Sequence, residues 1–210
     1  MTTHSRTIVV TGATGETGRA VAAALSEAGH TVVAIGSNAE RLSSVAANAH
    51  YVCDLTEGSR VADLAVRIRE EVAPVDGVVH LVGGWRGGND DESWEWLEPR
   101  LLTSLRHTTL AFRDDLTASD AGRLVIVGSV SATKPTWSGA NYSVLKAAEE
   151  AWMQAVASGW RKAGTAAAVI LAVQSIGDGG TPAGRLADAI LPLWTTDAAE
   201  LNGARIDLTA

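Results

Sequence analysis

The stretch TIVVTGATGETG, residues 7–18, decides which fold this 210-residue chain is expected to adopt. A short apolar run leads to glycines at intervals of three, Gly12, Gly15 and Gly18, and then to the helix-forming segment RAVAAALSEAG. Glycine allows a tight turn and a close approach of the backbone, and a helix N-terminus favours an anionic phosphate. The stretch therefore predicts a strand, a nucleotide-binding turn and a helix. A plain strand-to-helix turn is the alternative.

The rest of the chain alternates strand-sized apolar runs with longer Ala-rich or amphipathic segments. Apolar runs without polar alternation are typical of strands buried on both faces, and strands alternating with helices predict a covered parallel sheet. The right-handed crossover rule then favours a single doubly wound parallel α/β sheet of about seven strands, of Rossmann type. No linker or repeat interrupts residues 1–210, so one domain is expected. The expected strands are 7–10, 31–35, 51–53, 78–82, 124–127, 168–173 and 205–208, and the expected helices are 18–28, 39–47, 59–72, 93 to about 116, 143–162 and 183–193.

The composition disfavours several classes of function. The net charge is −7 and no Lys/Arg-rich run is present, which argues against a nucleic-acid or anionic-membrane partner. The single cysteine, Cys53, rules out an internal disulfide and fits a reducing cytoplasm. No apolar segment approaches the roughly 18 residues of a membrane span, and no signal peptide is expected. His80 and His107 have no further ligand at metal-binding spacing, so no metal site is expected.

A candidate reactive pair lies in the segment NYSVLK. Tyr142 and Lys146 are four positions apart, so on a helix both side chains lie on one face. A phenol with a pKa of about 10 is a poor proton donor at neutral pH, and a nearby ammonium lowers that pKa by about 1–3 units. Ser129 ends the fifth expected strand and precedes Tyr142 by 13 positions, so the fold can bring the two hydroxyls together. These three residues are the candidate catalytic group.

In this order and spacing, the motifs resemble the short-chain dehydrogenases/reductases over nearly the whole chain. The family's Tyr-x-x-x-Lys matches Tyr142 and Lys146, and its catalytic serine matches Ser129. Its glycine turn matches residues 12–18, with the spacing TGxxGxxG in place of TGxxxGxG. The segment VDGVVHLVGGWRGGN also looks like the dihydropteridine reductase branch of this family, which carries a similar Gly-Gly-Trp loop.

Further positions match the family or depart from it. The adenine-pocket acid matches Asp54, and the Asn-Asn-Ala-Gly segment falls on HLVG, residues 80–83. The family's catalytic asparagine falls near Thr103 and is missing, which puts a water-mediated proton relay in doubt. The Pro-Gly after the sixth strand is replaced by residues 173–174, and the segment that follows allows only a small substrate lid.

The resemblance implies hydride transfer between a nicotinamide cofactor and a carbonyl or alcohol carbon, or a pterin-like C=N bond, of a small-molecule substrate. Tyr142 would donate or accept the proton, Lys146 would lower its pKa and bind the ribose, and Ser129 would polarise the substrate. A homodimer or homotetramer built on the two long helices is also implied. The alternative is a catalytically weak or inactive nucleotide-binding or sensor protein of the same fold, which the missing asparagine favours.

The end of the second expected strand bears on the choice of cofactor. An NAD enzyme usually has an acid about 20 residues after the glycines, which bonds the ribose 2′-hydroxyl. Here Gly36 and Ser37 stand at that point, and Ser37, Asn38 and Arg41 could receive a 2′-phosphate. We therefore expect NADP(H) to be favoured, with NAD(H) possible. Ser37 and Asn38 could instead simply cap the next helix.

The expected binding residues follow from these matches. Flat side chains on loops at the carboxyl edge of the sheet could stack on a substrate ring. Trp85, Trp137 and Gln174 are the expected substrate contacts, although either tryptophan could equally fill the core. The expected cofactor contacts are Gly12, Thr14, Gly15, Glu16, Thr17, Gly18, Ser37, Asn38, Arg41, Asp54, Leu55, Gly83, Gly84, Tyr142, Lys146, Ser175 and Ile176.

Overall fold

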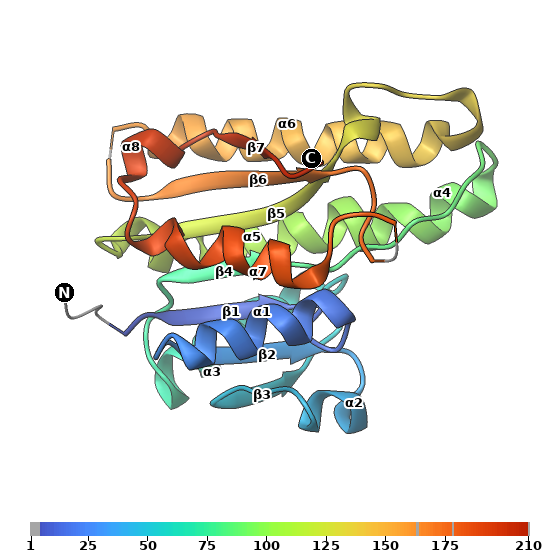
Figure 1. Cartoon of the computed structure of the whole chain (residues 1–210). Helices are drawn as coiled ribbons and strands as arrows, with labels where there is room; N and C mark the ends of the chain where they lie inside the picture. The colour runs from blue at the N-terminus through green and yellow to red at the C-terminus, as the bar shows by residue number, and fades with distance from the viewer. Residues whose placement is uncertain (1–4, 163, 178, 210) are drawn as a thin grey trace.

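The computed structural model describes residues 5–162, 164–177 and 179–209. These residues form a seven-stranded sheet in the order β3-β2-β1-β4-β5-β6-β7, and every neighbouring pair is parallel (Figure 1). The order reverses between β1 and β4, which is the switch point of a doubly wound sheet. The sheet is therefore the Rossmann-type sheet that the sequence predicts. The strands are β1 (Thr7–Thr11), β2 (Thr31–Gly36), β3 (Ala49–Val52), β4 (Gly77–His80), β5 (Arg123–Ser129), β6 (Ala167–Val173) and β7 (Arg205–Asp207).

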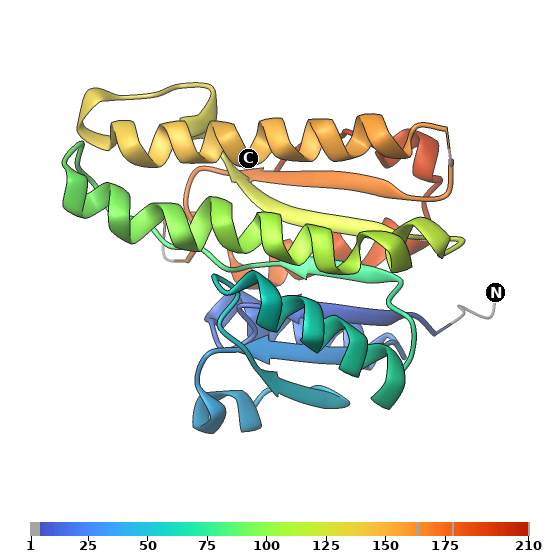
Figure 2. The ribbon, with the colours of Figure 1, turned by 180° about the vertical axis from the view of Figure 1, so that it is seen from behind.

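Helices cover both faces of this sheet. The α-helices are α1 (Glu16–Glu27), α2 (Ala39–Ser43), α3 (Gly58–Glu71), α4 (Asp91–Glu98), α5 (Ser104–Ala118), α6 (Ala140–Trp160), α7 (Ala183–Ile190) and α8 (Ala198–Leu201). The shorter turns are η1 (Pro99–Thr103), η2 (Val130–Ala132), η3 (Trp137–Gly139) and η4 (Leu191–Trp194). Helices α1 and α7 lie on one face in Figure 1, and α3, α5 and α6 lie on the opposite face in Figure 2. No helix among the described residues is long and apolar enough to span a membrane.

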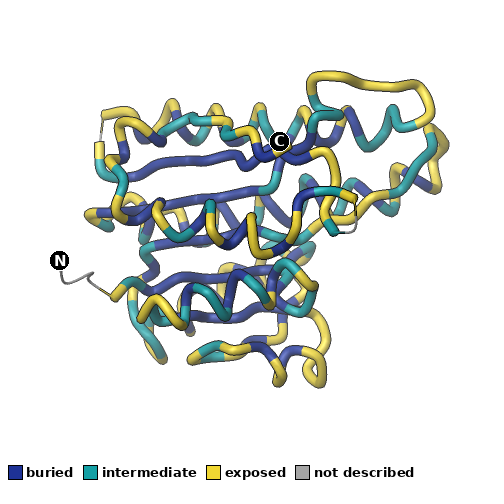
Figure 3. Tube along the Cα trace, in the orientation of Figure 1, coloured by how far each residue is buried: buried dark blue, intermediate teal, exposed yellow. Residues whose placement is uncertain are grey.

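The hydrophobic core consists of two layers, one on each face of the sheet. Successive residues of a strand point to opposite faces, so Ile8 and Val10 belong to the layer under α1 and α7, whereas Val9 belongs to the other. Phe112 of α5 and Met153 of α6 complete that second layer. Figure 3 shows the inner strands β1, β2, β4, β5 and β6 buried along most of their length, whereas the edge strands β3 and β7 are partly exposed. Burial on both faces explains why these strands read as continuous apolar runs.

The chain leaves β4 earlier than the expected strand over residues 78–82. His80 is its last residue and pairs with Thr11, the last residue of β1. After Thr11 the chain turns at Gly12, whose φ is +65°, so Leu81 and Val82 have no strand residue to pair with on that side. Both residues therefore lie in the loop at the carboxyl edge of the sheet.

The single long helix expected from residue 93 to about 116 is divided. Helix α4 ends at Glu98, a π-helical turn, η1, follows from Pro99 to Thr103, and α5 begins at Ser104. Pro99 has no backbone N–H to donate, so the series of α-helical backbone hydrogen bonds is interrupted at this point. Such turns in long helices often occur at functional sites, and this one supplies Pro99 and Arg100 to a cavity described below.

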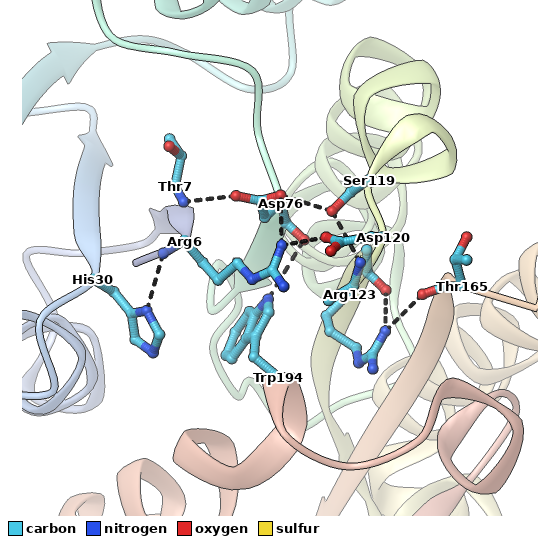
Figure 4. Close-up of polar contacts among 11 residues, drawn as sticks. Arg6, Thr7, His30, Asp76, Ser119, Asp120, Arg123, Thr165 and Trp194 are labelled. Carbon is cyan, nitrogen blue, oxygen red and sulfur yellow. Dashed lines mark hydrogen bonds and ion pairs between the residues drawn. The ribbon is translucent and has the colours of Figure 1, made fainter. Parts of the chain in front are cut away.

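The amino edge of the sheet is closed by a polar cluster (Figure 4). The buried guanidinium of Arg123 donates to the carbonyl oxygens of Gly122, Thr165, Leu193 and Thr196 at 2.7–2.9 Å. Asp76 accepts from the Thr7 backbone N–H at 3.0 Å and lies 3.6 Å from Arg6. These bonds tie the loops around η4 to the start of β5, so the amino edge is filled and the opposite edge holds the cavities.

Candidate active site

Two cavities of about 550 Å³ each lie at the carboxyl edge and share Leu81, Val82 and Gly83, the residues that follow β4. We name them the β5–β6 cavity and the β2–β3 cavity after the strands that border them. Among the predicted residues, the β5–β6 cavity is lined by Thr17, Gly83, Gly84, Trp85, Tyr142, Lys146, Gln174, Ser175 and Ile176. The β2–β3 cavity is lined by Gly12, Thr14, Gly15, Ser37, Asp54, Leu55 and Gly83. Glu16, Gly18, Asn38, Arg41, Ser129 and Trp137 are not among the lining residues of either cavity.

The glycine turn stands between the two cavities. A Cβ at Gly12 would lie 2.6 Å from the Leu81 carbonyl oxygen, and one at Gly18 would lie 2.4 Å from the Gly12 carbonyl oxygen, so neither position has room for a side chain. Gly15 is the N-cap of α1, and no side chain caps this helix. Gly15 lines the β2–β3 cavity and Thr17 the β5–β6 cavity, so the positive end of α1 lies where an anionic linker could cross from one to the other.

Tyr142 and Lys146 lie together on the wall of the β5–β6 cavity. Both belong to the start of α6, and the Lys146 Nζ is 5.9 Å from the centroid of the Tyr142 ring. The Lys146 ammonium is buried and donates to the Val127 carbonyl oxygen at 2.9 Å. The expected phenol–ammonium pair is thus present, and its cation is anchored to the end of β5.

The serine predicted as catalytic lies behind the cavity wall. Ser129 is 1% exposed, and its Oγ accepts a hydrogen bond of 3.1 Å from the Ser131 backbone N–H, which caps η2. Ser131, two residues later, lines the β5–β6 cavity. The sequence analysis missed Ser131, although it sits in the same VGSVS segment as Ser129.

Glu149 is a second lining residue that the sequence analysis missed. Its Oε2 lies 2.7 Å from the Lys146 Nζ, and both side chains are nearly buried. Burial lowers the pKa of Lys146, but the charges of Glu149, Tyr142 and Glu150 raise it, so that this pKa lies above its ordinary value. The spacing of three residues on one helix was the available signal.

His80 occupies the floor of the β5–β6 cavity as a buried, neutral ring. Its Nδ1 is 2.9 Å from the Thr11 Oγ1, and its Nε2 is 3.2 Å from the Ser104 Oγ. Burial, aided by the charge of Lys146, lowers the pKa of His80 to about 3. The ring therefore joins β1, β4 and α5 in one hydrogen-bonded chain.

Of the residues predicted to meet the adenosine half, Ser37, Asp54 and Leu55 line the β2–β3 cavity, whereas Asn38 and Arg41 lie outside its lining. Asp54 accepts from the backbone N–H and the hydroxyl of Thr56 at 2.9 and 2.7 Å, and these two hydrogen bonds lower the pKa of Asp54. Asn38 caps α2 by accepting from the Arg41 backbone N–H at 2.8 Å. The Arg41 guanidinium donates to the Thr14 carbonyl oxygen at 3.2 Å, which brings a cation to the glycine turn. Cys53, Arg100 and Ser104 also line this cavity.

Comparison with known proteins gives the family. Residues 6–181 match the family described as short chain dehydrogenase. The chain belongs to this family. An uncharacterized oxidoreductase of Staphylococcus epidermidis is 27% identical over 157 residues, which are 70% of this chain and 68% of the relative. A 3beta-hydroxysteroid dehydrogenase of Mediterraneibacter gnavus is 30% identical over 163 residues, 71% of this chain and 59% of the relative.

Solved structures agree with the fold of this short-chain dehydrogenase. An NADPH-bound short chain oxidoreductase of Pseudomonas aeruginosa PAO1, with an atypical catalytic center, superposes with a TM-score of 0.88 at 20% identity, over 96% of this chain and 94% of that one. At that identity the likeness concerns the fold. The comparisons give no support to the resemblance with dihydropteridine reductases in particular.

Thr103 and Trp137 line neither cavity, although the sequence singled out both positions. Thr103, at the place of the family's asparagine, donates through its hydroxyl to Glu98 Oε1 at 2.6 Å and is not among the lining residues of either cavity. Trp137 is 81% exposed in η3. Trp85 is 72% exposed and lines the β5–β6 cavity, so of the two tryptophans it is the one placed to meet a ligand there.

Proposed function

We propose that this short-chain dehydrogenase is an NAD(P)(H)-dependent oxidoreductase that interconverts a carbonyl and an alcohol group of a small molecule. The observation that carries the proposal is the pairing of Tyr142 with Lys146 in a cavity that adjoins the glycine turn. A phenol that exchanges a proton with substrate oxygen and a buried ammonium beside it are the parts that such chemistry requires.

The residues present fit a dinucleotide cofactor. The side-chain-free turn at Gly12 and Gly18 and the uncapped start of α1 would hold the diphosphate. Asp54 and Leu55 would meet the adenine in the β2–β3 cavity, and Gly83, Gly84, Ser175 and Ile176 would border the nicotinamide in the β5–β6 cavity. Gln174 would meet the substrate. When bound, the cofactor supplies or accepts the hydride.

The chain's own side chains then control the proton. Tyr142 gives its hydroxyl proton to the substrate oxygen in the reductive direction and takes a proton from an alcohol in the oxidative direction. Lys146 stabilises the phenolate electrostatically and, with a donor left over, holds the ribose. We assign the polarising donor to Ser129, at the family's serine position, whose Oγ accepts the Ser131 N–H, and the cavity-lining Ser131 is the alternative.

We further propose that NADP(H) is preferred over NAD(H). Gly36 and Ser37 border the β2–β3 cavity where an NAD enzyme usually has an acid, and the Arg41 guanidinium contacts the glycine turn nearby. A 2′-phosphate would gain a charge-assisted hydrogen bond there.

The substrate is expected to be a small molecule with an apolar or ring-like part. Trp85 and Ile176 are exposed at the β5–β6 cavity and offer a flat and an apolar surface to such a group. A ketone or aldehyde would depend strongly on Ser129. A pterin-like C=N bond would depend more on stacking against Trp85, so a panel should include both kinds of substrate.

Tyr142→Phe tests the proposed chemistry, because it removes the proton donor and keeps the ring. Turnover on any active substrate of the panel should be abolished, while the affinity for NADPH measured by cofactor fluorescence changes little. The matched control is Tyr51→Phe, since Tyr51 bonds Glu71 at 2.7 Å and lines neither cavity. Near-full activity of Tyr142→Phe would refute the assignment. NADPH binding without turnover on any panel substrate would support the alternative, a nucleotide-binding sensor.

A further inference from the structure

Glu149 is a buried acid for which the proposed chemistry gives no role. It is 2% exposed and lines the β5–β6 cavity. Among the described residues, its ion-pair partner is Lys146, whose Nζ lies 2.7 Å from the Oε2. Burial raises the pKa of Glu149, and the charge of Lys146 opposes that rise. A carboxylate buried at this depth is stable only when it is paired or hydrogen-bonded, and losing one partner of such a pair leaves an uncompensated charge in the protein interior.

The other charged groups around Lys146 do not replace Glu149. On the same helix, Glu150 pairs with Arg205 of β7 at 2.9 Å, and Tyr142 lies across the ammonium. From β4, His80 faces Lys146 as a neutral ring, since its pKa is about 3. Among the described residues, Glu149 is therefore the acid that compensates the Lys146 charge at contact distance.

The geometry of the ammonium explains what this pairing achieves. A lysine has three donors. One is directed to the Val127 carbonyl oxygen at 2.9 Å, and the Glu149 Oε2 lies 2.7 Å from the Nζ as an ion-pair partner. These two contacts, one on β5 and one on α6, prevent the long side chain of Lys146 from turning away from Tyr142.

We propose that Glu149 is the positioning residue of this site: its carboxylate is the counter-ion that keeps Lys146 charged and fixed beside Tyr142. The consequence for turnover rests on the proposed function, whereas the state of Lys146 does not. Without the carboxylate, burial favours the neutral amine, and the phenolate of Tyr142 loses its stabilising charge. The pair also provides an anchor for Lys146 that does not depend on the missing asparagine near Thr103.

The protonation of Lys146 can be measured directly by NMR with lysine labelled at Cε. The chain has only three lysines, Lys134, Lys146 and Lys162, and Lys146→Arg identifies the signal by its loss. Glu149→Gln removes the charge and keeps the shape of the side chain. We expect the pH midpoint of the Lys146 titration to fall by about 1–3 pH units in this variant. Lys134 and Lys162 are exposed and serve as internal references.

Two further variants separate charge from packing. Glu149→Gln should lower kcat at pH 7 by about 10-fold or more. Glu149→Asp keeps the carboxylate, so the pH midpoint of the Lys146 titration should stay close to that of the wild type and most of the turnover should be retained. Glu150→Gln, one position along the helix, is the matched control and should shift Lys146 much less. An unchanged or raised Lys146 midpoint in Glu149→Gln would overturn the assignment, and so would an equal fall in Glu150→Gln.

The outcomes distinguish this inference from the proposed function. The titration needs neither cofactor nor substrate, so an enzyme that turns over nothing would count against the proposed function and leave the Lys146 result standing. A wild-type enzyme that reduces a carbonyl, with a Lys146 midpoint indifferent to Glu149→Gln, would count against Glu149 alone.

Discussion

At the scale of the residue, the neutral ring of His80 makes the stability of the protein depend on pH. Burial and the charge of Lys146 lower its pKa to about 3, whereas a histidine in the unfolded chain has a pKa of about 6.5. Below about pH 6.5 the unfolded chain therefore binds a proton that the folded chain does not. The stability that His80 contributes is present above that pH and is lost as the pH falls toward 3.

His80→Asn should make the protein less sensitive to acid, because an amide can bond Thr11 and does not titrate. Between pH 7 and 4.5, the free energy of unfolding of the wild type should fall by about 2–3 kcal/mol more than that of the variant. Urea denaturation at both pH values measures this. His107→Asn is the control, since that ring is only partly buried and contacts the Leu55 carbonyl. Equal losses in wild type and His80→Asn would contradict the expectation.

Two serines, Ser129 and Ser131, compete for the role of polarising the substrate. Ser129 matches the family position and accepts the Ser131 N–H behind the cavity wall, whereas Ser131 lines the cavity. We expect Ser129→Ala to lower kcat on a carbonyl substrate by about 10²–10³, the usual cost of losing a donor to a developing oxyanion, and Ser131→Ala to have a smaller effect. Steady-state kinetics of the two variants decide this. The reverse ranking would move the role to Ser131.

At the scale of the element, the connection from β2 to α2 sets the choice of cofactor. Arg41 is held against the glycine turn by its bond to Thr14, at the edge where Ser37 replaces an acid. Arg41→Ala should weaken NADPH binding by about 10–100-fold, because a charge-assisted hydrogen bond contributes about 1.5–3 kcal/mol, and should leave NADH binding unchanged. Fluorescence titration tests this, with Arg67→Ala on α3 as the control. Tighter binding of NADH by the wild type would contradict the preference for NADP(H).

Arg123 joins elements that are far apart in sequence at the amino edge of the sheet. Replacing it with methionine would leave the carbonyls of Leu193, Thr165 and Thr196 without their donor. We expect Arg123→Met to lower the free energy of unfolding by about 2–4 kcal/mol, since each buried unsatisfied group costs about 1–3 kcal/mol and some relaxation occurs. The same change at exposed Arg113 should cost less than about 0.5 kcal/mol in urea denaturation. A comparable loss at both sites would mean that these bonds contribute little.

At the scale of the whole molecule, we expect self-association, which the family resemblance implies, at the face on which α5 and α6 lie (Figure 2). Leu110 of α5 and Val144 of α6 are 51% and 56% exposed, although both are large apolar side chains. We expect a homodimer or homotetramer by light scattering after size exclusion, and a larger monomer fraction for Leu110→Asp combined with Val144→Asp. Val66→Asp on α3 is the control, because Val66 is similarly exposed on another helix. A monomeric wild type would contradict this expectation.

The sequence by itself determined the fold class and the placing of Tyr142 and Lys146 on one helix face, because both depend on local spacing. Apolar runs buried on both faces and helix-length segments between them specify a parallel sheet, and a spacing of four on one helix specifies that Tyr142 and Lys146 share a face. The glycine turn can be predicted from the sequence for the same reason, since Gly12 adopts a positive φ and Gly18 packs directly against it.

Only the tertiary structure decided which of these residues meet. Glu149 is three residues from Lys146 on one helix, but its burial in the cavity wall depends on how α6 packs against β5 and β6. The bonds from His80 to Thr11 and Ser104 join β1, β4 and α5, which only the strand order brings together. Thr103 and Ser104 differ by one residue in sequence, yet Ser104 lines a cavity and Thr103 bonds Glu98, because a helix turns about 100° per residue and the π-turn at η1 shifts that phase.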